Sequence, residues 1–289
     1  MNLAQTYNRD RLAVSFELFP PKTETGMANL YENLDELVTC KPAFITCTYG
    51  AGGSTQSKTL EVLDGVMSRY KDIPVASHLT CVGSTVEELR TYIEEARRRG
   101  VQYIVALRGD PPKGEDKFVA PEGGFSYANE LVAMIRKEYP DMGIFVAGYP
   151  EVHQEAPDAI TDLLNLRRKV DAGADVVVTQ LFYDNDDFYR FRDRLALAKI
   201  DVPIVPGILP VTNLAMIQRL TSMCGSELPE KLVRRLSTHE GDEEGQYSAG
   251  VYHATRQVED LVEHGVPGVH FYVLNKSRAT AHICRALVL

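Results

Sequence analysis

The fold of this chain is indicated most clearly by two adjacent stretches, "STVEELRTYIEEARRRG" at 84–100 and "VQYIVALRG" at 101–109. The first stretch indicates an amphipathic helix, because Ser84 or Thr85 can cap its start, glutamates fill the first turn and arginines precede the closing Gly100. The second stretch is short, rich in Val and Ile and apolar on both faces, which is typical of a parallel strand covered on both sides. Together they predict one unit of an α/β fold.

The same two elements recur along the chain. The apolar runs are 12–19, 43–49, 74–80, 101–109, 143–150, 174–182, 202–209 and 268–274, with amphipathic stretches between them. Eight such repeats favour a closed barrel over an open sheet, and α/β barrels commonly reach 289 residues as one domain. No linker or shift in composition marks a second domain. We therefore expect a single (β/α)8 TIM barrel that spans 1–289 as one catalytic domain.

Two stretches do not fit the repeat. Residues 110–124 follow the fourth strand and are too rich in Pro, Gly and charge to be regular, and they lie on the face where barrel loops carry function. Residues 224–250 lengthen the seventh connection. There we expect an extra short helix with a structural role.

Composition excludes several classes of protein. The net charge is -9, without the basic excess that favours nucleic acid or an anionic membrane surface. The N-terminus lacks the apolar core of a signal peptide, and no apolar run approaches the roughly 20 residues of a spanning helix. The five cysteines are scattered and form no C-x-x-C pair, as in reduced cytoplasmic proteins. We expect a cytoplasmic protein with no nucleic-acid or membrane partner.

Motifs for common chemistries are absent from the sequence. No G-x-G-x-x-G follows a strand, and no P-loop, H-E-x-x-H or G-x-S-x-G occurs. No cluster of residues has metal-ligand spacing, so no metal site is expected.

Polar residues collect instead at the carboxyl ends of the expected strands, where barrel enzymes place their active sites. They are Glu17, Thr48, His78, Thr80, Arg108, Asp110, Tyr149, Glu151, His153, Gln180, Asn275 and Lys276, with Gly109 between Arg108 and Asp110. A purely structural barrel has no need of polar residues at so many strand ends.

Glu17 lies inside the apolar run "VSFELF", where a carboxylate is costly unless something pairs or uses it. Alternation places Ser15, Glu17 and Phe19 on one face of the strand. That face suits the barrel interior, so Glu17 would point into the mouth. The structural alternative is an ion pair with a core lysine or arginine.

Other candidates also have structural alternatives. His78 could be a satisfied core histidine, and Asp110, before Pro111, could form a turn or cap a helix. Asp162, Asn165, Arg168 and Lys169 share one face of a helix, which is either a solvated face or a set of groups for phosphate and sugar hydroxyls. Spacing alone leaves these alternatives open.

The chain resembles the bacterial, single-domain methylenetetrahydrofolate reductases over nearly its whole length. The motifs that carry the resemblance are "SFELFPPK", "TCTYGAGGST", "HLTC", "ALRGDPP", "YPEVHQEA", "DLLNLRRKVDAGAD", "TQLFYDND", "PGILPV" and "HFYVLN". The resemblance implies a barrel that binds FAD and takes electrons from NADH or NADPH. The reduced flavin then converts methylenetetrahydrofolate to methyltetrahydrofolate in a ping-pong scheme that supplies methyl groups for methionine.

The resemblance also implies roles for individual residues. Glu17 matches the general acid, and Asp110 lies by the flavin and the folate. Positions that match FAD contacts are Thr48, His78, Arg108, Gly109, Asp110, Tyr127, Ala128, Tyr149, His153, Asp162, Asn165, Arg168 and Lys169. Glu17, Asp110, Gln180 and Lys276 match folate contacts, although arginine is more common than Lys276 in relatives. Met216 stands where relatives usually have a glutamine, so no folate contact is assigned to it.

The implied chemistry requires that Glu17 can donate a proton. Opening the five-membered folate ring needs a proton on the departing nitrogen, so Glu17 must stay protonated near neutral pH. An ordinary glutamate has a pKa of about 4.3, and we expect the apolar strand to raise it. Two rivals are a different pterin-binding barrel enzyme, such as a methyltransferase, and a non-catalytic flavin-binding protein. A homo-oligomer is expected.

Overall fold

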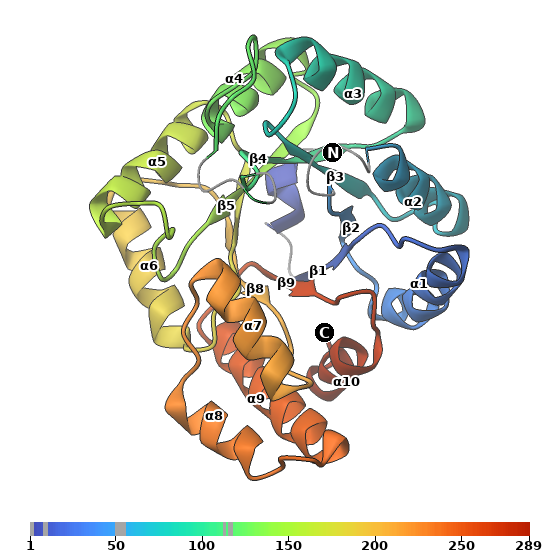
Figure 1. Ribbon diagram of the computed structural model, residues 1–289, viewed down its shortest axis with the longest axis vertical. Helices are drawn as coiled ribbons and strands as arrows, with labels where there is room; N and C mark the ends of the chain where they lie inside the picture. The colour runs from blue at the N-terminus through green and yellow to red at the C-terminus, as the bar shows by residue number, and fades with distance from the viewer. Residues whose placement is uncertain (1–2, 8–10, 50–55, 112–113, 115–117) are drawn as a thin grey trace.

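Parallel strands close into a barrel in the computed structural model, which describes residues 3–7, 11–49, 56–111, 114 and 118–289 (Figure 1). The strands are β1 (Ala13–Leu18), β2 (Phe44–Cys47), β3 (Val75–Thr80), β4 (Tyr103–Leu107), β5 (Gly143–Gly148), β6 (Val176–Thr179), β7 (Ile204–Val205), β8 (Gly207–Ile208) and β9 (Gly268–Tyr272). The order in the sheet is β7-β6-β5-β4-β3-β2-β1-β9-β8. The (β/α)8 barrel expected from the sequence is confirmed.

The seventh expected strand, 202–209, closes the barrel in two halves. β7 pairs with β6, and β8 pairs with β9 on the other side. Pro206 separates them because proline has no backbone N–H to donate. Its carbonyl still accepts a hydrogen bond of 2.9 Å from the backbone N–H of His270. The expected strand is therefore present, broken at its proline.

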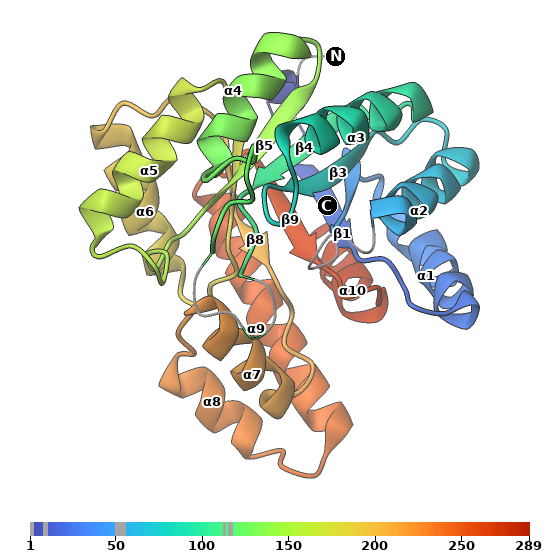
Figure 2. The ribbon, with the colours of Figure 1, turned by 45° about the horizontal axis from the view of Figure 1, so that its top comes forward.

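Helices surround the strands, and α7, α8 and α9 extend away from the ring at its lower end (Figures 1 and 2). The helices are η1 (Leu3–Tyr7), α1 (Glu24–Leu37), η2 (Val38–Cys40), α2 (Gln56–Arg69), α3 (Val86–Arg99), α4 (Ala128–Glu138), α5 (Ala159–Asp171), α6 (Asn185–Leu197), α7 (Leu214–Cys224), α8 (Glu230–Ser237), α9 (Glu243–Glu263) and α10 (Arg278–Leu287). The extra short helix expected within 224–250 is α8. Within the described part of the chain, no helix is both long and apolar enough to span a bilayer.

The strands bury side chains on two sides, as the apolar runs predicted. Val14, Phe16 and Leu18 of β1 belong to the large core between strands and helices. Inside the barrel, aromatic side chains such as Phe44 pack with Leu3 and Tyr7 of η1.

Candidate active site

Glu17 faces the barrel interior near the carboxyl end of β1, beside two histidines. Its Oε2 lies 3.3 Å from Nε2 of His78 on β3 and 3.7 Å from Nε2 of His270 on β9. The hydroxyl of Ser15 is 2.8 Å from Nδ1 of His270. The partners of Glu17 are therefore imidazoles rather than the lysine or arginine of the structural alternative, and they form a polar layer across three strands.

The pKa of Glu17 is lowered to about 2, and the expectation of a raised pKa is wrong. Burial is the largest single influence and does raise the pKa. The charges and hydrogen bonds of His78 and His270 together outweigh it. The sequence run around Glu17 shows only the apolar strand, whereas the histidines come from strands far away along the chain.

Two buried hydroxyls share the interior of the barrel with Glu17. The Oγ1 atoms of Thr46 and Thr80 are buried and have no hydrogen-bond partner among the described residues. Thr46 pairs in register with Glu17, and Thr80 ends β3, two residues after His78. Because buried polar atoms are nearly always hydrogen-bonded in native proteins, these hydroxyls point to a polar ligand in the barrel mouth.

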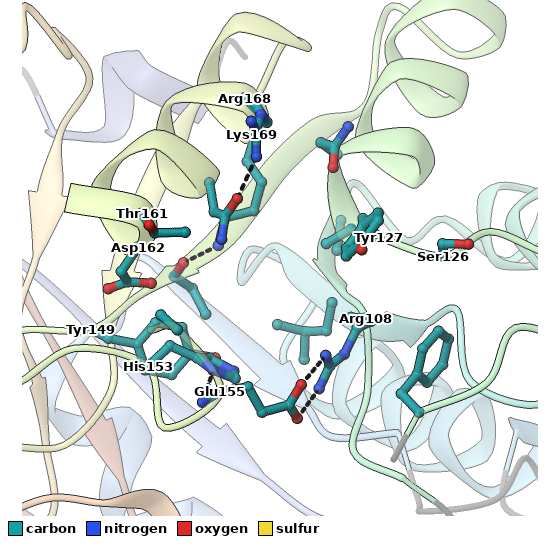
Figure 3. A pocket seen from close by; sticks show the side chains of 18 of the residues that line it. Arg108, Ser126, Tyr127, Tyr149, His153, Glu155, Thr161, Asp162, Arg168 and Lys169 are labelled. Carbon is teal, nitrogen blue, oxygen red and sulfur yellow. Dashed lines mark hydrogen bonds and ion pairs between the residues drawn. The ribbon is translucent and has the colours of Figure 1, made fainter. Parts of the chain in front are cut away.

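A cavity of about 1020 Å³ opens beside this mouth, between the ends of β4 and β5 and the helices α4 and α5 (Figure 3). It brings together most of the residues that the resemblance assigned to FAD. They are Arg108, Tyr127, Ala128, Tyr149, His153, Asp162, Asn165, Arg168 and Lys169. Thr48, His78, Gly109 and Asp110 are not among its lining residues.

The polar stripe of α5 borders this cavity. Lys169 Nζ donates a hydrogen bond of 2.5 Å to the carbonyl of Ala147, and burial lowers the pKa of Lys169 to about 8. Burial also raises the pKa of Asp162, which lies nearby on the same helix. Arg168 donates to Oδ1 of Asn165 at 2.6 Å. The stripe is thus a wall of the cavity rather than a wholly solvated face.

Arg108 extends from the end of β4 into the same cavity and is held by Glu155. The guanidinium makes two hydrogen bonds of 2.6 Å to the two carboxylate oxygens (Figure 3). The ring of His153 meets that of Tyr149 edge-on at 4.5 Å, and the backbone N–H of Glu155 donates to Nδ1 of His153. Sequence reasoning gave Glu155 no role, since a loop carboxylate has no periodic signal.

Gly109 is required by close packing at the turn after β4. Its φ is +88°, and a Cβ there would lie 2.7 Å from Cγ1 of Val82. Asp110, next in the chain, is exposed, and its charge adds to the burial that raises the pKa of Tyr149. The glycine-rich turn at 50–55 lies outside the described residues, as does most of 112–117.

The residues expected to bind folate end other strands of the barrel. Gln180 follows β6, is half-buried and accepts a hydrogen bond from the N–H of Leu181 through Oε1. Lys276 is exposed in the connection after β9. Met216 is half-buried in the first turn of α7, where its N–H is capped by Asn213. Within the described chain, no hydrogen bond or ion pair joins Gln180 or Lys276 to Glu17, and no group of acidic, His and Cys residues suits a metal ion.

Comparisons with known proteins agree on one family. The family model described as Methylenetetrahydrofolate reductase matches residues 2–288. The chain is 42% identical over 287 residues to "Methylenetetrahydrofolate reductase (NADH) 1" of Arabidopsis thaliana, covering 96% of the chain and 48% of that protein. It is 41% identical over 277 residues to "5,10-methylenetetrahydrofolate reductase" of Escherichia coli, covering 96% and 91%. The chain thus spans about half the length of its plant relatives.

A solved structure shares the fold at low sequence identity. It is an uncharacterized protein from Clostridium thermocellum that binds two copies of 5-methyl-5,6,7,8-tetrahydrofolic acid. The TM-score is 0.65 at 17% identity, covering 98% of this chain and 97% of that one.

Proposed function

The chain belongs to the methylenetetrahydrofolate reductase family, and on that premise we propose that it reduces 5,10-methylenetetrahydrofolate to 5-methyltetrahydrofolate with electrons from NADH or NADPH and FAD as cofactor. The observation that carries this proposal is the large cavity with its cationic wall, which opens beside a barrel mouth that contains Glu17. The proposal includes residues 1–289 acting as one catalytic domain. It also includes a cytoplasmic homo-oligomer that supplies methyl groups for methionine.

The residues of the cavity fit FAD in size and in chemistry. A volume of about 1020 Å³ is at the upper end for small-molecule pockets, as an extended dinucleotide requires. Arg108, Arg168 and Lys169 would hold phosphates, and Asp162 and Asn165 would hold sugar hydroxyls. The Thr80 hydroxyl, which has no hydrogen-bond partner among the described residues, would face the flavin end together with Thr48, Gly109 and Asp110. When bound, the flavin supplies the hydride chemistry.

The protein must deliver a proton to the folate nitrogen that leaves when the ring opens. The low pKa of Glu17 means that its carboxylate is ionised beside its histidines, so we place the proton on the group formed by Glu17, His78 and His270. Folate binding would exclude water from the mouth and favour the neutral carboxylic acid, which then donates the proton. Ser15 fixes the ring of His270.

Other side chains would bind and stabilise the substrate. The exposed carboxylate of Asp110 would favour the iminium cation that forms when the folate ring opens. Gln180, half-buried at the end of β6, would hydrogen-bond the pterin through the amide N–H2 that its contact with Leu181 leaves available. The exposed ammonium of Lys276 would meet the anionic glutamate tail of folate.

Anaerobic spectroscopy of the purified protein with FAD tests the proposal. FAD should bind, NADH or NADPH should bleach it, and methylenetetrahydrofolate should restore the colour with one equivalent of 5-methyltetrahydrofolate formed. Initial rates at several concentrations of both substrates should give the parallel lines of a ping-pong scheme. A protein that binds folate but not FAD would instead be a different pterin enzyme. One that binds FAD but is never reoxidised by the folate would be a non-catalytic flavin protein.

A further inference from the structure

The Arg108–Glu155 pair places a carboxylate inside the cavity that we assign to FAD. Nη1 and Nη2 of Arg108 each donate a hydrogen bond of 2.6 Å to one carboxylate oxygen of Glu155 (Figure 3). This two-pronged contact is the same geometry by which arginine binds phosphate. The carboxylate therefore occupies the position on Arg108 that a phosphate oxygen pair would take.

Arg108 differs from the other two cations that line the cavity. Arg168 donates to the neutral amide of Asn165, and Lys169 donates to a backbone carbonyl, so their partners carry no charge. Among the described lining residues, Arg108 is the cation whose hydrogen bonds go to a carboxylate. An arriving anion can bind Arg168 and Lys169 without displacing a charged group. To bind both Nη1 and Nη2 of Arg108, the two donors that form its fork, it must displace the carboxylate of Glu155.

Glu155 is placed so that its side chain can leave. The side chain of Glu155 is 51% exposed, whereas that of Arg108 is 20% exposed. The backbone N–H of Glu155 remains bound to Nδ1 of His153, which holds the main chain while the carboxylate rotates into solvent. Exchange would have a modest cost, because the displaced carboxylate moves into water while the phosphate takes over both hydrogen bonds of Arg108.

We propose that Glu155 is an internal competitor for the diphosphate of the dinucleotide: its carboxylate holds the fork of Arg108 and is replaced there by phosphate when the cofactor enters. This inference rests on the proposed function, since it takes FAD as the ligand. The competitor keeps the fork of Arg108 paired in the ligand-free protein. It also favours ligands whose anion can accept hydrogen bonds from both Nη1 and Nη2 of Arg108, as a diphosphate can, because weaker anions would not displace the carboxylate.

Fluorescence titration of the FAD-free protein with FAD tests the inference without any measurement of activity. Glu155→Gln keeps the size of the side chain but removes the charge that binds Arg108. The variant should bind FAD about three- to tenfold more tightly than the wild type. Glu155→Ala should change affinity in the same direction, and it serves if the glutamine variant does not fold.

Glu138→Gln is the matched control. Glu138 makes the same two-pronged contact with Arg90, at 2.8 and 2.9 Å, on the outer helices α3 and α4 and away from the cavity lining. Its loss changes the net charge equally but should leave FAD affinity unchanged. In an Arg108→Gln background, Glu155→Gln should improve affinity by about twofold or less, because only the general repulsion of the phosphates then remains.

The outcomes are distinguishable. Tighter binding that depends on Arg108 supports the competitor role. Equal or weaker binding by both Glu155 variants overturns it, and weaker binding would make Glu155 a residue that positions Arg108 for the ligand. A wild-type protein that does not bind FAD overturns the proposed function and this inference with it.

Discussion

Nε2 of His78 lies 3.3 Å from Oε2 of Glu17, so the carboxylate in the barrel mouth is paired with an imidazole rather than isolated in an apolar strand. His270 lies on β9, which pairs with β1 on the side away from β2 and β3, and its Nε2 is 3.7 Å from the same oxygen. The two histidines reverse the effect of burial and lower the pKa of Glu17 to about 2. Proton donation by Glu17 therefore depends on its neighbours.

The first prediction concerns stability in acid. The pKa of Glu17 is lowered to about 2 in the folded chain, below the ordinary glutamate value of about 4.3, so its contribution is complete above about pH 5 and is lost as the pH falls toward 2. Relative to Glu17→Gln, the wild type should gain up to about 3 kcal/mol of unfolding free energy as the pH rises from 2 to 6. Urea unfolding across this range measures it.

His78→Gln provides the comparison for this prediction. Without that imidazole, burial has more weight and the pKa of Glu17 should rise. The acid-dependent loss of stability should then begin at higher pH than in the wild type. An unchanged pH profile would show that His78 does not stabilise the carboxylate.

The second prediction is that replacing Lys169 raises the stability of the fold but weakens the binding of FAD. Its pKa of about 8 is below the ordinary 10.5, so its buried charge destabilises the fold below pH 8, and this cost disappears as the pH rises from 8 to 10.5. Lys169→Met should raise the Tm of the FAD-free protein at pH 7, with a smaller gain at pH 10. It should weaken FAD binding by at least about tenfold, the loss of one charge-assisted hydrogen bond.

Lys137→Met is the control for charge alone, because Lys137 is exposed on α4 and is not part of the cavity lining. Neither Tm nor FAD affinity should increase or fall appreciably. If Lys169→Met lowers the Tm and leaves FAD affinity intact, then Lys169 is a structural residue bound to Ala147.

The third prediction compares two glycines, one where a side chain would be unfavourable only because of the positive φ, and one where it would also clash with neighbouring atoms. Gly83 and Gly109 both have positive φ, of +69° and +88°, but a Cβ at Gly83 would meet nothing within 4 Å. A Cβ at Gly109 would lie 2.7 Å from Val82 and 3.0 Å from Thr80. Gly83→Ala should cost about 1 kcal/mol of unfolding free energy, and Gly109→Ala about 2–4 kcal/mol. Equal losses in denaturant unfolding would refute the crowding at the β4 turn.

Local patterns explain what the sequence could predict. The alternation in β1 placed Glu17 in the barrel interior, and the helical period of α5 gathered the residues from Asp162 to Lys169 on one face. Both patterns depend only on residues that are close in the sequence, so they can be recognised without knowledge of the whole fold. Pro206 is a local signal of the same kind, but the strand at 202–209 was expected to be continuous, and only the structure shows that it breaks there.

Long-range pairs explain what the sequence could not predict. The pKa of Glu17 depends on His78 and His270, which only barrel closure brings together. The Arg108–Glu155 pair joins a strand end to a loop 47 residues later, and no spacing rule selects it. The hydroxyl of Thr46 became a candidate only because the folded chain leaves it without a described partner. The roles assigned to individual site residues stay predictions.

Anaerobic stopped-flow absorbance of Glu17→Gln, with each half-reaction followed separately, tests directly whether Glu17 donates the proton that opens the folate ring. Glutamine keeps the shape of Glu17 but has no carboxylic proton. NADH should bleach the flavin at close to the wild-type rate, because reduction of FAD needs no proton from Glu17. Reoxidation by methylenetetrahydrofolate should slow by at least about 100-fold, the low end for loss of a positioned acid. Equal slowing of both steps, or no slowing of reoxidation, would show that Glu17 is not the acid that opens the folate ring.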